Sequence, residues 1–285
     1  MNLKLRPGTP EDAGACGRIC YDAFAAVAAA HGHPCDFPDP EVATGLVTAL
    51  LGRPGIFSVV AEAGGEVVGS NFLDERAAIA GVGPITVAPA AQNGAVGRQL
   101  MEAVMDRAAE RGAAGVRLVQ TAYHARSLSL YAKLGFVARE PLACLQGPPP
   151  GVTMEGRSLR PGTAADVDAC NALCRAVHGH DRAPQVDDAV AGGTALVVEH
   201  GGRITGYSTG LSFFAHSVGA TADDIRVLIG AADGFGGSGI LVPIRHGPLF
   251  RWCLDQGLRV VQLMTLMTTG LYNEPAGAWL PSIMY

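Results

Sequence analysis

A repeated segment is the feature that most constrains how this chain folds. The pentapeptide Leu-Arg-Pro-Gly-Thr at residues 5–9 recurs 154 residues later, at residues 159–163. An Asp and two Cys follow at the same spacing in both copies, as Asp12, Cys16 and Cys20 and as Asp166, Cys170 and Cys174. A repeat of this kind indicates two related units, and 285 residues suffice for both. We therefore predict domains at residues 1–145 and 157–285, joined by a proline-rich linker over 146–156.

Each copy opens with the pattern of a strand, a turn and a helix. Thr9 with Asp12, and Thr163 with Asp166, have the spacing of a capping box, and apolar residues then recur every three or four positions. A Gly-Gly pair at 64–65 and again at 201–202 joins two short β-branched runs, which predicts an antiparallel hairpin. In the first copy, the pattern continues with strands at 83–87, 116–121 and from 136, and with helices at 96–108 and 127–134. Each unit is therefore predicted to be α/β, with a mixed, mostly antiparallel sheet flanked by helices.

Charge and composition exclude several classes of function. The chain has 21 Lys and Arg against 26 Asp and Glu, a net charge of −5, so it lacks the basic surface of a nucleic-acid-binding protein. The N-terminal residues alternate and carry charge, and the apolar run 23–30 is too short to span a bilayer. We expect a cytoplasmic protein with neither a nucleic-acid nor a membrane partner.

The cysteines and histidines give no metal-site pattern. Seven cysteines are an odd number, and the paired ones stand four apart, without C-x-x-C spacing. We therefore predict buried free thiols. His31 and His33 lie close to Cys35 and Asp36, but this spacing suits neither a helix face nor a Cys2His2 site. No metal is expected there.

Residues 85–98 form the segment with the clearest chemical content. A strand, Ile-Thr-Val, runs through a loop of small residues directly into a helix. Backbone N–H groups at such a helix start converge on an anion, and the helix dipole adds attraction. The segment is neither a P-loop nor G-x-G-x-x-G. Taken alone, it also fits an ordinary connection in which small residues only allow tight packing.

A second element, Leu-Tyr-Ala-Lys-Leu-Gly-Phe at 130–136, decides between these alternatives. Together with V-x-P-x-x-Q-x-x-A-x-G at 87–97, it resembles the Gcn5-related N-acetyltransferase (GNAT) family over nearly all of residues 3–145. The resemblance implies that acetyl-CoA is the co-substrate. Its pyrophosphate would bind at Gln92, Asn93, Gly94, Ala95, Val96, Gly97 and Arg98, and its pantetheine arm along the backbone of Ile85, Thr86 and Val87. Ala95 replaces the usual first glycine of the loop. His124 replaces the asparagine that commonly bonds to the arm, and the resemblance implies that His124 and Ser127, on the same element, also contact the cofactor.

Tyr131 matches the family's general acid, which protonates the departing thiolate. A phenol within hydrogen-bond reach of the sulfur can perform this step, while a strand amide polarises the thioester carbonyl. The alternative for Tyr131 is an amphipathic ring that packs beside leucines with its hydroxyl at the surface. The base that deprotonates the acceptor amine is left open, and the candidates by residue type are Glu62, Asp74, Glu75, His31 and His33.

The second copy has diverged at the site. Alignment at the fixed offset of 154 matches Pro243 with Pro89 and places bulky residues where the phosphates would lie. The pair Leu271-Tyr272 echoes Leu130-Tyr131, but a proline follows it at 275. We expect a degenerate second domain that has lost the cofactor.

The chain is thus identified as a tandem member of the GNAT family. The expected function is acetyl-CoA-dependent N-acetylation of a small-molecule or peptide amine. The alternatives are a catalytically silent acyl-CoA-binding or regulatory protein and, more weakly, a structural interaction protein. Neither the acceptor nor the oligomeric state follows from the sequence.

Overall fold

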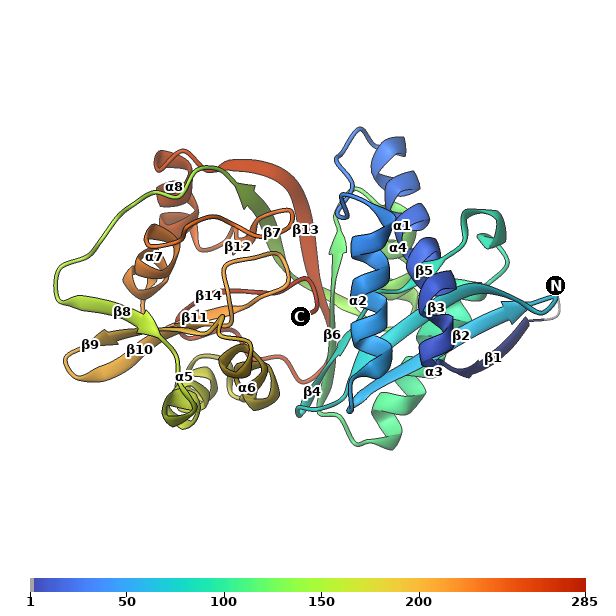
Figure 1. The fold of residues 1–285 in the computed structure, drawn as a ribbon, viewed down its shortest axis with the longest axis horizontal. Helices are drawn as coiled ribbons and strands as arrows, with labels where there is room; N and C mark the ends of the chain where they lie inside the picture. Colours follow the sequence, from blue (N-terminus) through green and yellow to red (C-terminus); the bar gives the residue numbers. More distant parts are fainter. Residues whose placement is uncertain (1–2) are drawn as a thin grey trace. The chain divides into compact units, whose positions relative to one another are not determined.

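The chain forms two compact units (Figure 1). A computed structural model describes residues 3–285. The first unit comprises the residues up to Leu118 together with Tyr123–Val137, and the second comprises Val119–Ala122 together with Ala138–Tyr285.

The first unit is an α/β structure in which both faces of the sheet are covered. Its elements are β1 (Leu3–Pro7), α1 (Ala13–Ala30), α2 (Pro40–Gly52), β2 (Ile56–Ala63), β3 (Glu66–Asp74), β4 (Ile79–Val82), β5 (Thr86–Val87), α3 (Val96–Glu110), β6 (Gly115–Thr121) and α4 (Ala125–Lys133). Strands β1, β2, β3 and β4 are antiparallel neighbours, and β4 pairs in parallel with the start of β6. The consecutive residues Val59, Val60 and Ala61 of β2 are all buried, which requires packing on both faces. Helices α1 and α2 pack on each other and on the sheet, and α3 packs against β2 and β3.

The second unit repeats the same opening and then differs. Its elements are β7 (Val137–Gln146), β8 (Arg157–Pro161), α5 (Val167–His178), α6 (Ala183–Ala191), β9 (Leu196–His200), β10 (Arg203–Ser208), β11 (Ser217–Gly219), α7 (Ala222–Gly230), β12 (Ile240–Pro243), α8 (Gly247–Asp255), β13 (Arg259–Gly270) and β14 (Ala278–Leu280). One sheet has the order β14-β11-β10-β9-β8, and β7 lies between β13 and β12. Residues 147–156 contain no helix or strand.

Local sequence rules account for the start of both units. The predicted capping boxes are confirmed at Thr9 with Asp12 and at Thr163 with Asp166. Arg6 closes the first box with two hydrogen bonds of 2.7 Å to Asp12, and Arg160 does the same for Asp166 at 2.7 and 2.8 Å. Both Gly-Gly hairpins are confirmed, because β2 pairs with β3 and β9 with β10.

Other elements differ from the sequence-based expectation. The strand expected at 83–87 begins earlier and is interrupted, so that β4 ends at Val82 and β5 starts at Thr86. Helices α2, α6 and α7 and strand β14 were not predicted. Six of the seven cysteines are buried free thiols as expected, whereas Cys35 is partly exposed. Across residues 3–285, no helix combines the length and apolar character that crossing a membrane requires.

Candidate active site

The short strand β5 offers a free edge in the first unit. It pairs with β3 through Ser70 with Thr86 and Gly69 with Val87, and within the described chain β3 is its strand partner. The pairing of β4 with β6 extends to Gly81 and does not continue along β5. Between Val82 and Thr86 the chain uses one residue more than β3 does, which is a β-bulge. The sequence-predicted residues Ile85, Thr86 and Val87 therefore lie on a bulged strand with one side open to a ligand backbone.

The loop after β5 leads into α3 without any capping side chain. Ala95 precedes the helix in the left-handed conformation, with φ of 60°, and Asn93 has φ of 71°. A left-handed residue directly before helical ones turns successive N–H groups toward one point, a concavity that binds anions. The first helical bond runs from the Gln99 N–H to the Ala95 carbonyl at 3.1 Å. The amides of residues 96–98 therefore have no acceptor among the described residues.

Two side chains connect this loop to its neighbours. Gln92 donates from Nε2 to the Val87 carbonyl at 3.3 Å and accepts at Oε1 from Arg126 at 3.2 Å. A methyl group on Gly97 would lie 3.7 Å from both Val87 and Leu130, so the start of α3 packs against the middle of α4 here. Sequence reasoning missed Arg126, because 34 residues separate it from Gln92. It brings a guanidinium to the loop, whereas the guanidinium of Arg98 pairs with Glu102 on α3 at 3.5 Å.

The Tyr131 side chain, on α4, is buried in the first unit. The side chain is 7% exposed, and its ring centroid is 6.2 Å from that of Phe136. Burial raises the pKa of the hydroxyl well above its usual value near 10. No residue of the described chain forms a hydrogen bond with the hydroxyl. The ring is therefore packed, as the alternative also expects, and its hydroxyl has no partner within the described chain.

The two other predicted residues of α4 have local roles. His124 precedes the helix without capping it, and burial, with a smaller contribution from Arg126, lowers its pKa. Ser127 donates from its hydroxyl to the His124 carbonyl at 2.9 Å. Both residues lie within one helical turn of Arg126, which contacts Gln92.

Three of the five candidate bases are held by arginines. Glu62 accepts from Arg6 at 2.6 Å, and Asp74 from Arg76 at 2.7 Å. Glu75 accepts two bonds of 2.7 Å from Arg107, which holds the pKa of Glu75 below its ordinary value. These carboxylates stabilise the fold, so the structure leaves the two imidazoles as the better candidates.

His31 and His33 follow α1 and meet the segment before α4. The His33 ring stacks on Tyr123 with centroids 4.2 Å apart, and the His31 ring lies 5.1 Å from Tyr123 and 6.5 Å from His124. No group of three or more metal-binding side chains is found within residues 3–285.

The second unit has a counterpart for strand β5 and for helix α3. Strand β11 pairs with β10 as β5 pairs with β3, and α7 follows β11 as α3 follows β5. The free edge of β5 has no equivalent, because β14 pairs with β11 and also lies against β12. Thr221 and Asp224 form a capping box on α7, with the Thr221 N–H bonded to Asp224 at 2.9 Å. The start of α7 thus holds the carboxylate of Asp224, whereas the first turn of α3 has no acidic side chain.

This correspondence corrects the fixed-offset alignment. Helix α8, after β12, matches α4 and not α3, because His246 and His124 precede them with nearly the same backbone angles. Counting onward, Cys253 takes the position of Tyr131, and Gly257 (φ of 89°) that of Gly135 (φ of 90°). The predicted counterparts Pro243 and Leu271-Tyr272 are therefore wrong: Pro243 ends β12, and the pair follows β13 outside any helix.

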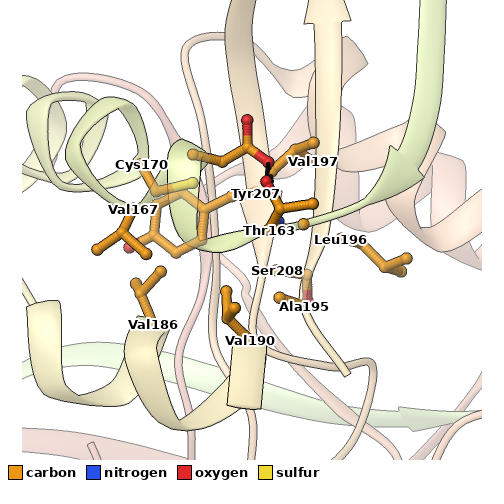
Figure 2. A pocket seen from close by; sticks show the side chains of 12 residues that line it. Thr163, Val167, Cys170, Val186, Val190, Ala195, Leu196, Val197, Tyr207 and Ser208 are labelled. Atoms are coloured by element: carbon orange, nitrogen blue, oxygen red, sulfur yellow. Dashed lines mark hydrogen bonds between the residues drawn. The ribbon is translucent and has the colours of Figure 1, made fainter. Parts of the chain in front are cut away.

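The second unit also contains a small cavity between α5, α6 and the sheet (Figure 2). It is lined mainly by apolar side chains, among them Val186, Val197 and Tyr207. It has room for roughly one water molecule, which excludes a nucleotide at this place.

Comparison with known proteins agrees with the geometry of the first unit. The sequence model of the acetyltransferase (GNAT) family matches residues 25–136. The IAA acetyltransferase of Azospirillum brasilense is 33% identical over 107 residues, which cover 37% of this chain and 70% of that protein.

Two solved structures have the same fold over nearly the whole chain. A Pyrococcus horikoshii protein assigned as an acetyltransferase covers 98% of this chain and 94% of its own, with a TM-score of 0.75 and 16% identity. A tandem GNAT protein from the clavulanic acid biosynthesis pathway covers 94% of this chain and 98% of its own, with a TM-score of 0.55 and 15% identity. The chain therefore belongs to the GNAT family of N-acetyltransferases, as a member with two GNAT-like domains.

Proposed function

We propose that the first unit transfers the acetyl group of acetyl-CoA directly to the primary amine of a small-molecule or peptide acceptor. The observation that carries this proposal is the start of α3, where residues 96–98 have open amides and no side chain caps the helix. Diphosphate fits such a site because it accepts several N–H bonds at once and is attracted by the helix dipole. Arg98 and Arg126 add positive charge beside the loop.

The remaining parts of the reaction follow from the neighbouring elements. The edge of β5 would pair with the amides of the pantetheine arm and direct the thioester toward α4. The amine nitrogen then forms a bond to the carbonyl carbon, and the carbon–sulfur bond breaks. Tyr131 donates its proton to the departing thiolate, and the amine gives up its own proton to a base or to water.

The burial of Tyr131 suits this role. Because burial raises its pKa, the hydroxyl is fully protonated at neutral pH and remains so up to about pH 9. Its hydroxyl makes no bond within the described chain that would have to break before it meets the sulfur.

Thiol release from acetyl-CoA against a panel of primary amines tests the activity. We expect Tyr131→Phe to lower kcat by about 100-fold and to leave the KM for acetyl-CoA within about twofold. Tyr21→Phe, on α1, is the matched control and should behave as the unmodified protein. An unchanged kcat in Tyr131→Phe would show that the hydroxyl is not the acid.

Calorimetry with CoA separates the enzyme from a silent CoA-binding protein. We expect one CoA per chain, bound by the first unit. Binding without thiol release for any amine would support the silent alternative. Binding of two CoA molecules per chain would contradict the expectation that the second unit has lost its cofactor site.

A further inference from the structure

The outward side of β5 carries the main-chain groups of Val87. Val87 stands opposite Gly69 of β3, and the next N–H, that of Ala88, donates to the Val68 carbonyl at 2.9 Å. Inter-strand hydrogen bonds alternate along an antiparallel pair, so the N–H and C=O of Val87 point away from β3. They face the free edge at which the proposed function places the pantetheine arm.

A side chain of the following loop already uses one of these two groups. The 3-10 turn Pro89–Ala91 folds the chain back, and the Gln92 Nε2 donates to the Val87 carbonyl at 3.3 Å. The Gln92 Oε1 accepts from Arg126, in the first turn of α4, at 3.2 Å. A primary carboxamide thus takes the position in which an amide of a ligand would pair with the edge, and the same carboxamide holds the guanidinium beside the loop.

The second unit fills the equivalent edge with main chain instead of a side chain. Gly206 is the fourth residue after its Gly-Gly turn, as Gly69 is in the first unit. Because Gly206 pairs with Gly219 of β11, Gly219 is the counterpart of Val87. Strand β14 pairs with Gly219 through Ala278. The outward side at this position is thus occupied by the protein itself in both units, by a whole strand in the second and by one carboxamide in the first.

We propose that the Gln92 carboxamide is an internal substitute for an amide of the pantetheine arm, and that the cofactor displaces it on binding. This inference rests on the proposed function and adds to it a step that precedes catalysis. Leaving the edge breaks the hydrogen bonds of Gln92 to Val87 and to Arg126. A strand such as β14 would instead have to unpair along its whole length.

The two contacts of Gln92 contribute differently to this displacement. At Val87 one amide donor replaces another, which is nearly neutral in free energy. At Arg126 the neutral amide oxygen gives way to phosphate oxygens, and charge-assisted hydrogen bonds are about twice as strong as neutral ones. The phosphates of the cofactor therefore drive the exchange that opens the edge to the arm.

Removal of the carboxamide tests the proposal. Calorimetry measures the Kd for CoA, and competition with CoA measures the Ki of pantetheine, which has the arm but no phosphate. Gln92→Ala removes the internal competitor and should lower both constants about three- to fivefold. If the Gln92 side chain instead held the cofactor phosphates, the same variant would bind CoA more weakly. A raised or unchanged Kd for CoA would therefore overturn the proposal.

Gln92→Glu separates the two contacts. A carboxylate has nearly the same shape but no N–H to donate to the Val87 carbonyl, so the Ki of pantetheine should fall as it does in Gln92→Ala. The carboxylate also attracts Arg126 and repels phosphate, so the Kd for CoA should rise at least tenfold. A change in the same direction for both ligands would overturn the exchange at Arg126.

Gln256→Ala, at a partly exposed glutamine of the second unit, is the matched control and should change neither constant. If the unmodified protein binds no CoA, the proposed function is rejected and this inference with it. If it binds CoA, and binds it more weakly after Gln92→Ala, this inference alone is rejected and the proposed function stands.

Discussion

Helices α3 and α7 occupy the same place in the two units and begin in opposite ways. The start of α3 has no cap and contains two left-handed residues, whereas α7 begins with a capping box and with Asp223 and Asp224 in its first turn. The first arrangement costs backbone strain and leaves the amides of residues 96–98 unpaired, whereas in the second the Asp224 carboxylate accepts from the Thr221 N–H within the chain. A fold of this type therefore needs no anion at this helix to be stable. The proposed binding site is the place where the first unit leaves backbone N–H groups without an acceptor.

The comparison extends to two further positions. Where α4 carries Tyr131, α8 carries Cys253, which is completely buried. Burial raises the pKa of this thiol to about 12, so it does not act as a nucleophile at neutral pH. Strand β14 completes the sheet beside β11, whereas β5 keeps a free edge. Three local differences, at the helix start, at the Tyr131 position and at the sheet edge, thus separate the proposed binding unit from the second unit.

The largest expected effect comes from adding a carboxylate at the start of α3, like the carboxylates at the start of α7. Gly94→Asp places a carboxylate beside the open amides of α3, and the site has space for the side chain. We expect the Kd for CoA to rise about 30-fold, close to 2 kcal/mol. Isothermal titration measures this, and Gly94→Asn, with the same shape and no charge, should change the Kd less than threefold. An equal rise of the Kd for CoA in both variants would mean that the size of the side chain, rather than its charge, weakens binding at α3.

A second prediction concerns a feature that the units share. Arg6 holds the pKa of Asp12 at about 2, and Arg160 likewise lowers the pKa of Asp166. A carboxylate whose pKa is lowered by folding stabilises the protein fully above its unfolded pKa near 3.9, and this contribution is lost as the pH falls toward 2. We expect Asp12→Asn to remove roughly 2 kcal/mol at pH 7 and to flatten the pH dependence between about 4 and 2.

Urea unfolding as a function of pH measures this loss. Asp166→Asn should flatten the same pH range, whereas Asp106→Asn, an exposed residue of α3, should not. If only one of the two substitutions flattened the pH dependence, the capping boxes would not contribute equally to the stability of the two units.

The smallest expected effect concerns the strain in the loop. Ala95 has φ of 60°, a conformation that costs an alanine about 1 kcal/mol relative to glycine. We expect Ala95→Gly to raise the melting temperature of the protein by a few degrees, and Ala88→Gly, at a residue with negative φ, to lower it. A destabilised Ala95→Gly would indicate that the alanine methyl packs favourably and that the strain is compensated locally.

Local patterns in the sequence predicted the parts of the fold that depend on neighbouring residues. The capping boxes, the Gly-Gly hairpins and helix α3 follow from spacing and propensity alone. The alignment of the second unit failed because α1 has 18 residues and α5 has 12, so a fixed offset drifts after the first helix. Matching Pro243 with Pro89 therefore compared different elements.

The parts of the fold and of the site that the sequence did not predict depend on contacts between distant segments. Arg126 reaches Gln92 across a helix and a strand, and β14 pairs with β11 across about 60 residues. Neither contact leaves a periodic signal in the sequence. The role of the loop and of Tyr131 was predicted from resemblance, and the structure adds that the open amides and the buried hydroxyl lie on adjoining elements.

Strand β14 has a thermodynamic consequence for how the two units respond to metabolite supply. A covalently tethered segment is present at a millimolar effective concentration regardless of the surrounding solution. The second unit therefore keeps its sheet edge filled when CoA is scarce, and its unfolding should not depend on nucleotide. If the first unit binds CoA as proposed, its stability rises as the ligand accumulates, whereas the stability of the second unit stays constant.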